Sequence, residues 1–354
     1  MEKPKKRTYD YILIVIVFLL VIIGWYVLYS TSAYNGQVKF QDSFYYLKKQ
    51  LFATSLGIAG MYITAKIDYH VWQKFALPAY LISLVLSLLV LFIGDEYNGS
   101  KRWLSFGPLS FQPSEFAKLA VILFLAWLIC KVKKKVLLIM VSVLPIVGLV
   151  GVGNLSTAII ILGIGIVLVF VASPSYTQFI WLGLAAISFM TIFLALESYR
   201  LERIAIWLNP EGYEKGYQTL QGLYAIGSGG LFGRGTGESI QKLGFVPEAQ
   251  NDMIFSIICE EWGLVGASFL ILLFLLLIWR FFLIAVYAKD LFGSLIAAGA
   301  MAHMMIQVIL NIAVVTNTIP NTGITLPFVS YGGTSVLFLL MEIGVVLNVS
   351  NLLE

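Results

Sequence analysis

A few charged side chains stand where a strongly apolar chain turns polar, and they are the residues best suited to chemistry. Asp252 lies at the boundary between a polar stretch and the apolar run that follows it. A carboxylate in such a place can accept a proton from an attacking hydroxyl group. Arg102 and Lys118 lie in a second polar stretch, and both residue types bind phosphate well. Because charge at membrane depth is costly, we expect these residues to be functional.

Asp252 admits two interpretations. At the start of a helix it could be a plain N-cap or a first-turn acid, which the helix dipole favours. At a cavity that faces the membrane surface it could be a general base. Glu260 and Glu261 follow about two helical turns later. We expect them to point to different faces, at least one of them inside the bundle, and to support Asp252 from deeper in the same helix.

The second polar stretch predicts the start of a helix. Pro113 suits the first turn, with Gln112 or Ser114 near the cap. Glu115 and Lys118 are then neighbours one turn apart on one helix face. The pair could be a lysine that reaches toward the membrane surface beside a glutamate at a helix end. Together with the nearby arginine, it could instead form a cationic pocket for an anionic group.

A third polar stretch, 317–335, carries prolines and glycines that prevent a continuous helix. Irregular backbone near a membrane is tolerated where it is buried in protein or lines a cavity. The stretch could be a re-entrant loop that simply packs. Alternatively, Ser330, Tyr331 and the backbone amides of Gly332 and Gly333 could bind an anion.

The composition defines the class of protein. Of 354 residues, 59% are hydrophobic and 12% are charged, whereas water-soluble domains average about 25% charged residues. Two cysteines cannot form a disulfide framework, and the two histidines lack metal-ligand spacing. The glycine-rich stretch 227–237 lacks the spacing of nucleotide-binding loops, so we expect a close-packed loop with sharp bends. No nucleic acid and no organic cofactor is expected.

The apolar runs predict an all-α polytopic membrane protein with a single domain, 1–354, and about ten transmembrane helices. The first run, 11–28, is long enough to span and is interpreted as an uncleaved helix. The long polar stretch 197–252, between the seventh and eighth helices, is predicted to be an extracellular loop with a function. The further apolar runs lie near 48–65, 77–94, 114–130, 136–153, 155–172, 177–196, 253–287, 291–316 and 330–350.

The lysines and arginines between these runs predict the orientation. With the N-terminus inside, the cytoplasmic segments hold more of these residues than the short outer loops do, and the basic cluster 131–135 decides the assignment. Both termini are then cytoplasmic, in a multi-pass protein of the cytoplasmic membrane. The stretches 95–113, 197–252 and 317–330 fall together on the outer face, so the candidate base and the candidate cations share one side.

Four motifs in order carry a resemblance to a known family. The motifs are NGSKRWLSFGPLSFQPSEFAKL (98–119), GYQTLQGLYAIGSGGLFGRGTGES (216–239), FVPEAQNDMIFSIICEEWGLVG (245–266) and ITLPFVSYGGTS (324–335). Through them the chain resembles the SEDS family, the cell-shape, division and sporulation proteins of the FtsW, RodA and SpoVE type, over essentially its whole length. The residues of 317–335 resemble the division or sporulation branch more than the elongation branch.

The resemblance implies a peptidoglycan glycosyltransferase that polymerises lipid II into β-1,4 glycan strands at the outer face of the membrane, with a class B penicillin-binding protein as partner. The family's catalytic aspartate matches Asp252, its cations match Arg102 and Lys118, and its acidic partner matches Glu115. A divalent cation, Mg²⁺ or Mn²⁺, is expected to help with the leaving pyrophosphate. An aspartate of ordinary pKa, about 3.9, is expected to act as a weak base while the bond forms.

One departure and two competing functions accompany the resemblance. Members often carry Pro-Asp-Leu-Gly-Thr between helices five and six, where this chain has Asn154 in place of the acid. A role for an acid at that turn is therefore not carried over. A lipid II flippase would also need a lipid groove and a cationic headgroup site, and a division scaffold would need no catalysis. The absence of repeated halves and the crowding of polar residues on one face favour surface chemistry.

Overall fold

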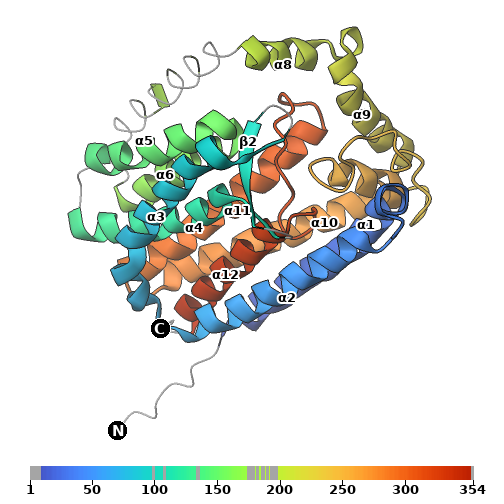
Figure 1. Cartoon of the computed structure of the whole chain (residues 1–354). Coiled ribbons are helices and arrows are strands. Elements are labelled where there is room, and N and C mark those ends of the chain that lie inside the picture. Colours follow the sequence, from blue (N-terminus) through green and yellow to red (C-terminus); the bar gives the residue numbers. More distant parts are fainter. Residues whose placement is uncertain are drawn as a thin grey trace.

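Long apolar helices form the body of the protein in this computed structural model, which describes residues 9–97, 100–106, 109–132, 136–173 and 198–351, with single positions between 180 and 191 (Figure 1). The described helices are α1 (Tyr11–Phe40), α2 (Tyr45–Lys66), α3 (Trp72–Ile93), α4 (Pro113–Val132), α5 (Val136–Gly153), α6 (Leu155–Ala172), α8 (Ser198–Leu208), α9 (Tyr217–Gly229), α10 (Ile254–Tyr287), α11 (Leu291–Val315) and α12 (Gly333–Ser350).

The helical membrane architecture is confirmed. Within the described residues, 7 helices are long and apolar enough to cross a membrane: α1, α3, α5, α6, α10, α11 and α12. The predicted total of about ten stays a prediction. Of the remaining apolar runs, two form α2 and α4, and the run 177–196 lies outside the described residues apart from single positions.

Two helices extend beyond the apolar runs that predict them. Helix α1 continues to Phe40, with the polar residues Thr31 and Ser32 fully buried, and ends at Gln41 in a left-handed conformation. Helix α3 begins at Trp72, five residues before the predicted start, and tolerates Pro78 in its second turn. Both extensions show that tertiary packing, and not hydropathy alone, sets the ends of these helices.

Side-chain caps define several helix starts, and both ends of the described chain lie on one side of the bundle. Asp10 caps α1 through Leu13 N (2.9 Å), and Asn154 caps α6 through Thr157 N (3.2 Å). The backbone N–H of Asp10 also donates to Ser350 Oγ at 3.2 Å. The start of α1 therefore touches the end of α12.

Helices α4, α11 and α12 lie in the interior, with α1 and α2 along one flank and α3, α5 and α6 along the other (Figure 1). Helix α10 packs against α11 and keeps an exposed apolar face. Small residues permit close packing of these helices, as is common in membrane proteins. A Cβ on Gly344 of α12 would lie 2.0 Å from Thr64 Oγ1 of α2. A Cβ on Gly299 of α11 would lie 2.7 Å from Ile122 Cγ2 of α4.

The stretch 95–113 adds a small sheet to the predicted helical fold. It forms a three-stranded antiparallel sheet in the order β1–β2–β3, with β1 (Asp95–Tyr97), β2 (Ser100–Phe106) and β3 (Leu109–Phe111). The sequence signal was the Asn-Gly pair between the first two segments, since this dipeptide is typical of two-residue hairpin turns. Aromatic residues in the strands suit a half-buried pleated surface. The sheet lies at the end of the bundle that also carries α8 and α9 (Figure 1).

The stretch 197–252, predicted as a long loop between two membrane helices, is partly helical in its described residues. It contains α8, two short 3₁₀ helices and α9 before a run of turns that ends at α10. The glycine-rich part does bend sharply, as predicted. Gly233 has φ 78°, and a Cβ on it would lie 2.1 Å from the Glu261 carbonyl oxygen. Gly263 interrupts α10 with φ 66° at the point where this loop packs against the helix.

Candidate functional site

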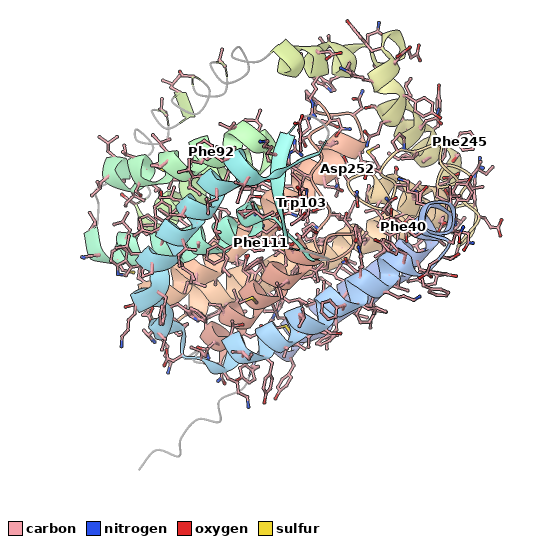
Figure 2. The ribbon with its side chains drawn as sticks, in the orientation of Figure 1. Phe40, Phe92, Trp103, Phe111, Phe245 and Asp252 are labelled. Carbon is pink, nitrogen blue, oxygen red and sulfur yellow. The ribbon has the colours of Figure 1, made fainter. Side chains whose placement is uncertain are left out.

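The three polar stretches meet at one end of the bundle, as the sequence predicts. Ser330 Oγ donates to the Asn251 carbonyl at 2.7 Å, which joins the third stretch to the residue before Asp252. Thr334 Oγ1 donates to the Ser110 carbonyl at 3.0 Å, which joins the same region to the sheet. Figure 2 shows Asp252 at this end, beneath α8 and α9. The candidate base therefore lies where segments far apart in the sequence converge.

Asp252 is buried in the turn that precedes α10, with 7% of its surface exposed. Gln218 Nε2 of α9 lies 3.5 Å from its Oδ1. A Cβ on Gly323 would lie 3.8 Å from its Oδ2, so the third polar stretch passes directly beside the carboxylate. The cap of α10 is Met253, which has no side-chain capping bond within the described chain, so the plain N-cap interpretation is wrong.

Burial, and to a smaller degree the nearby Glu248 carboxylate, raise the pKa of Asp252 to about 7 against the opposing effect of Arg203. The expected ordinary pKa is therefore wrong, because the carboxylate is removed from water by elements that are distant in sequence. A pKa near neutrality suits a general base, since the group is partly ionised and still basic enough to take a proton.

Glu115 and Lys118 form the predicted pair, with 3.0 Å between Oε1 and Nζ, on the first turns of α4. Helix α4 begins at Pro113, and the Gln112 carbonyl accepts the Glu115 N–H at 3.1 Å. Lys118 is 1% exposed and also donates to Gln307 Oε1 at 3.1 Å. The lysine therefore points into the core and does not reach toward the membrane surface.

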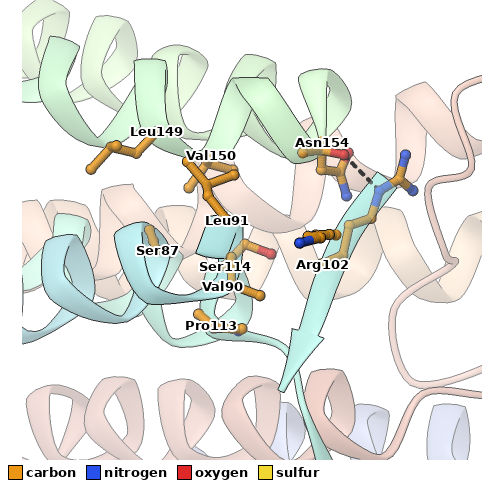
Figure 3. A pocket seen from close by; sticks show the side chains of 11 residues that line it. Ser87, Val90, Leu91, Arg102, Pro113, Ser114, Leu149, Val150 and Asn154 are labelled. Carbon is orange, nitrogen blue, oxygen red and sulfur yellow. Dashed lines mark hydrogen bonds between the residues drawn. The ribbon is translucent and has the colours of Figure 1, made fainter. Parts of the chain in front are cut away.

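Arg102 lies elsewhere, in an open pocket between the sheet and the α5–α6 turn (Figure 3). Its Nε donates to the Gly153 carbonyl at 2.7 Å. Ser114 lines the same pocket, so the structure brings this predicted residue and Arg102 together. Lys118 is not among the described residues that line it. The two predicted cations therefore occupy different surroundings, a pocket for one and the core for the other.

Two of the predicted anion-binding groups of the third stretch, Ser330 and the Gly332 N–H, have partners inside the protein. Ser330 Oγ accepts from Leu326 N at 2.8 Å and donates to Asn251. The Gly332 N–H donates to Gln50 Oε1 at 3.1 Å, and Gly333 is the first residue of α12. Anion binding by these residues stays a prediction, and their hydrogen bonds show that they also brace the turn beside Asp252.

Glu260 and Glu261 are buried and paired, as predicted. Glu260 accepts from Ser239 Oγ at 2.5 Å, and Glu261 accepts from Lys242 Nζ at 2.8 Å and from Ser30 Oγ at 2.7 Å. Both carboxylates therefore anchor the loop that leads to Asp252, from deeper in the same helix.

Three amide side chains near the carboxylate were missed by reasoning from the sequence: Gln218, Gln307 and Asn311. The first lies in the stretch predicted to be a loop. The other two lie in an apolar run, spaced one helical turn apart, and that spacing was the signal that could have found them.

The described residues contain no group of three or more His, Cys, Asp or Glu side chains placed to hold a metal ion. The carboxylates of Asp252 and Glu248 interact, but the partners identified for Asp252 are an amide side chain and backbone groups. The protein groups alone therefore do not fit a resident divalent metal, which prefers several oxygen ligands.

Fold and site together define a polytopic helical membrane protein with a buried carboxylate at one end of its bundle and a nearby pocket that holds an arginine. The family model FtsW/RodA/SpoVE, described as cell cycle protein, matches residues 10–354. The chain therefore belongs to the FtsW/RodA/SpoVE family.

Relatives and solved structures agree with this family. Stage V sporulation protein E of Bacillus subtilis (strain 168) is 41% identical over 358 residues, covering 98% of both chains. A probable peptidoglycan glycosyltransferase FtsW of Trichlorobacter lovleyi is 36% identical, covering 99% of this chain and 95% of the relative. A chain of a solved peptidoglycan synthase complex has a TM-score of 0.82 and 31% identity, covering 97% of this chain and 98% of that one. The crystal structure of RodA from Thermus thermophilus has a TM-score of 0.74 and 30% identity, covering 98% of both.

Proposed function

We propose that the protein is a peptidoglycan glycosyltransferase that polymerises lipid II into β-1,4 glycan strands at the outer face of the cytoplasmic membrane. The observation that carries the proposal is Asp252, a buried carboxylate with a pKa raised to about 7 where three polar segments meet. The relatives named as glycosyltransferases, similar over nearly their full length, support the same activity.

The reaction assigns roles to Asp252 and Arg102. The acceptor 4-hydroxyl of lipid II attacks C1 of the donor sugar, the new C1–O4 bond forms, and the bond from C1 to the polyprenyl pyrophosphate breaks. Asp252 takes the hydroxyl proton, which contributes about 10² to 10⁴-fold to the rate. Direct displacement inverts the donor configuration and needs no covalent enzyme intermediate. Arg102, in its pocket at the same end, stabilises the negative charge that develops on the leaving pyrophosphate.

The location follows from the same proposal. Both described ends of the chain lie on one side of the bundle, opposite the end that holds Asp252. We place the termini in the cytoplasm and Asp252 at the outer surface, because lysine and arginine favour the cytoplasmic side. Membrane lipid surrounds the apolar helices, and the substrate's own lipid tail lies between them.

The partner in this proposal is a class B penicillin-binding protein, the transpeptidase that crosslinks new strands. The similarity to a chain of a peptidoglycan synthase complex, described as coordinating polymerization and crosslinking, supports such an assembly.

We also propose that a divalent cation, Mg²⁺ or Mn²⁺, accompanies the pyrophosphate. Since the described residues do not build a resident site, its ligands come mainly from the substrate's phosphate oxygens. Chelation with EDTA should then lower polymerisation, and adding back either ion should restore it. Full activity after chelation would contradict this part of the proposal.

The activity is tested with purified protein and its penicillin-binding partner in detergent, where no membrane separates two sides. Wild-type protein should form glycan polymer from lipid II, and Asp252→Asn should form little or none while staying folded. A flippase would show transport in vesicles and no polymer in detergent. A scaffold would keep its function in cells after the same substitution. Near-normal polymer from Asp252→Asn would remove the general-base role.

A further inference from the structure

Helix α11 carries a stripe of three buried polar side chains, spaced one turn apart: His303, Gln307 and Asn311. Their exposed fractions are 2%, 2% and 0%, although the helix is apolar enough to span a membrane. Polar groups at such depth are costly and are kept where they serve a function. The contacts of this stripe lead toward Asp252, and the mechanism above makes no use of it.

Asn311 holds two main-chain carbonyls at once. Its Nδ2 donates to the Asp252 carbonyl at 2.8 Å and to the Ile324 carbonyl at 2.7 Å. An amide nitrogen has two hydrogens, so both bonds form together. The first bond fixes the main chain of the candidate base. The second fixes the segment that passes the carboxylate at Gly323.

Gln307 holds the next carbonyl of the same segment, because its Nε2 donates to Thr325 O at 3.0 Å. Its Oε1 accepts from Lys118 Nζ at 3.1 Å and lies 2.9 Å from His303 Nε2. This orientation of the amide is forced. A lysine ammonium only donates and a carbonyl only accepts. If the amide were flipped, its NH₂ group would face the Lys118 ammonium and its oxygen would face the Thr325 carbonyl, and neither bond could form.

The forced orientation also determines the hydrogen on His303. Because Gln307 Oε1 can only accept, His303 Nε2 must carry a hydrogen and donate it. The other ring nitrogen, Nδ1, lies 2.9 Å from Glu342 Oε2 on α12, so one proton lies between these two groups. A buried chain therefore runs from α12 through α11 to α4, and it locks Gln307 from both sides.

We propose that Asn311 and Gln307 are positioning residues of the glycosyl-transfer site. They hold the main chain of Asp252 and the segment 323–325 in one mutual arrangement, with Lys118 and His303 fixing the amide of Gln307. The inference rests on the proposed function, since positioning is defined by the reaction that it serves. A misplacement of about 1 Å at a reacting group can cost about 10²-fold in rate.

The test uses two substitutions that keep the shape of each side chain and remove donated bonds. Each also adds a buried carboxyl group, and the matched control described below adds one as well. Asn311→Asp and Gln307→Glu replace an amide by a carboxylate, which when ionised has no hydrogen to give. Gln307→Glu still accepts from Lys118 and His303. We expect kcat for lipid II polymerisation to fall about 10- to 100-fold for each, with KM for lipid II within about threefold of the wild-type value.

A matched control is available at the other end of the bundle. Asn348 is a buried amide on α12 whose Nδ2 donates to the Ala65 carbonyl at 2.7 Å. Asn348→Asp removes the same kind of bond far from the site, so it should lower thermal stability without changing kcat per folded molecule. The proposal is overturned if Asn311→Asp and Gln307→Glu keep kcat within twofold of wild type. It is also overturned if their activity falls only in proportion to the amount of folded protein that is lost, as is expected for the control.

A second measurement separates this proposal from the proposed function. Hydrogen–deuterium exchange of peptides spanning 250–254 and 321–328 should accelerate in Asn311→Asp and Gln307→Glu and stay unchanged in Asn348→Asp. Unchanged exchange in the first two variants overturns positioning, whatever their activity. Absence of polymer from the wild-type protein, with accelerated exchange in the variants, would instead count against the glycosyltransferase function alone.

Discussion

Asn311 holds the main chain of Asp252, with 2.8 Å between Nδ2 and the carbonyl oxygen, while the carboxylate of Asp252 lies at a longer 3.5 Å from Gln218 Nε2. The main chain is thus tightly bonded, while the side-chain partner identified for the carboxylate is distant and its other bonds come from the neighbouring backbone groups of Asp252 and Met253. A general base benefits from this combination, since its position is set in advance while its oxygens stay available for the substrate hydroxyl. Several measurable consequences depend on this arrangement.

The rate of polymerisation should depend on pH through Asp252. The base must be ionised, and burial raises its pKa to about 7, so kcat/KM should fall as the pH drops below about 7. Glu248 raises this pKa and Arg203 lowers it. Glu248→Gln should therefore move the acid limb to lower pH, and Arg203→Gln should move it to higher pH. Initial rates measured from about pH 5 to 9 check this, and limbs that stay in place in both variants would contradict it.

Asp252→Asn should stabilise the folded protein at alkaline pH. A carboxyl whose pKa is raised on folding binds its proton more tightly in the folded state, so wild-type stability falls as the pH rises from about 4 to 7. The neutral amide avoids this loss, which amounts to about 2–4 kcal/mol at pH 8. Thermal unfolding in detergent at about pH 5 and pH 8 should show a larger gain over wild type at the higher pH. An equal or smaller gain at pH 8 would count against the raised pKa.

Breaking the buried Glu115–Lys118 pair should destabilise the protein strongly. Both side chains are nearly inaccessible, and removing one partner leaves a buried charge at a cost of about 3–5 kcal/mol. Lys118→Met and Glu115→Gln should each lower the unfolding temperature, and the double variant should recover part of the loss. The exposed pair Lys215–Glu202 is the control, since Lys215→Met should change stability by less than about 1 kcal/mol. Equal effects at the two sites would contradict the burial argument.

Arg102→Ala should weaken polymerisation without unfolding the protein. Arg102 lines an open pocket and is partly exposed, so its replacement should cost less stability than the loss of a fully buried charge. We expect kcat/KM for lipid II to fall about 10- to 1,000-fold, because a preorganised charge at the leaving group stabilises the transition state. Lys101→Ala in the same pocket is the comparison and should cost less, since an ammonium is a point charge whereas a guanidinium can bind phosphate through two parallel bonds. Loss of folded Arg102→Ala protein alone would favour a structural role.

Several structural features of the protein depend on local sequence. The pair Glu115–Lys118 followed from a spacing of three residues on one helix, and the start of α4 followed from Pro113. The apolar runs became membrane helices because long apolar segments without charge have few other stable states. The hairpin in 95–113 also had a local signal in its Asn-Gly pair, whereas α8 and α9 occupy a stretch whose glycines and aromatics resemble loop composition.

The sequence by itself therefore determined the class of protein, its membrane helices and its family, because hydropathy, helix periodicity and motif order are properties of contiguous residues. Only the tertiary structure decided the state of the site. The pKa of Asp252 depends on desolvation by segments that are distant in sequence. The separation of Arg102 from Lys118 depends on the packing of the sheet against the α5–α6 turn. The hydrogen bond from Asn311 to the Asp252 carbonyl depends on the packing of α11 against the turn that precedes α10. Such effects arise from contacts across the chain, and no single segment encodes them.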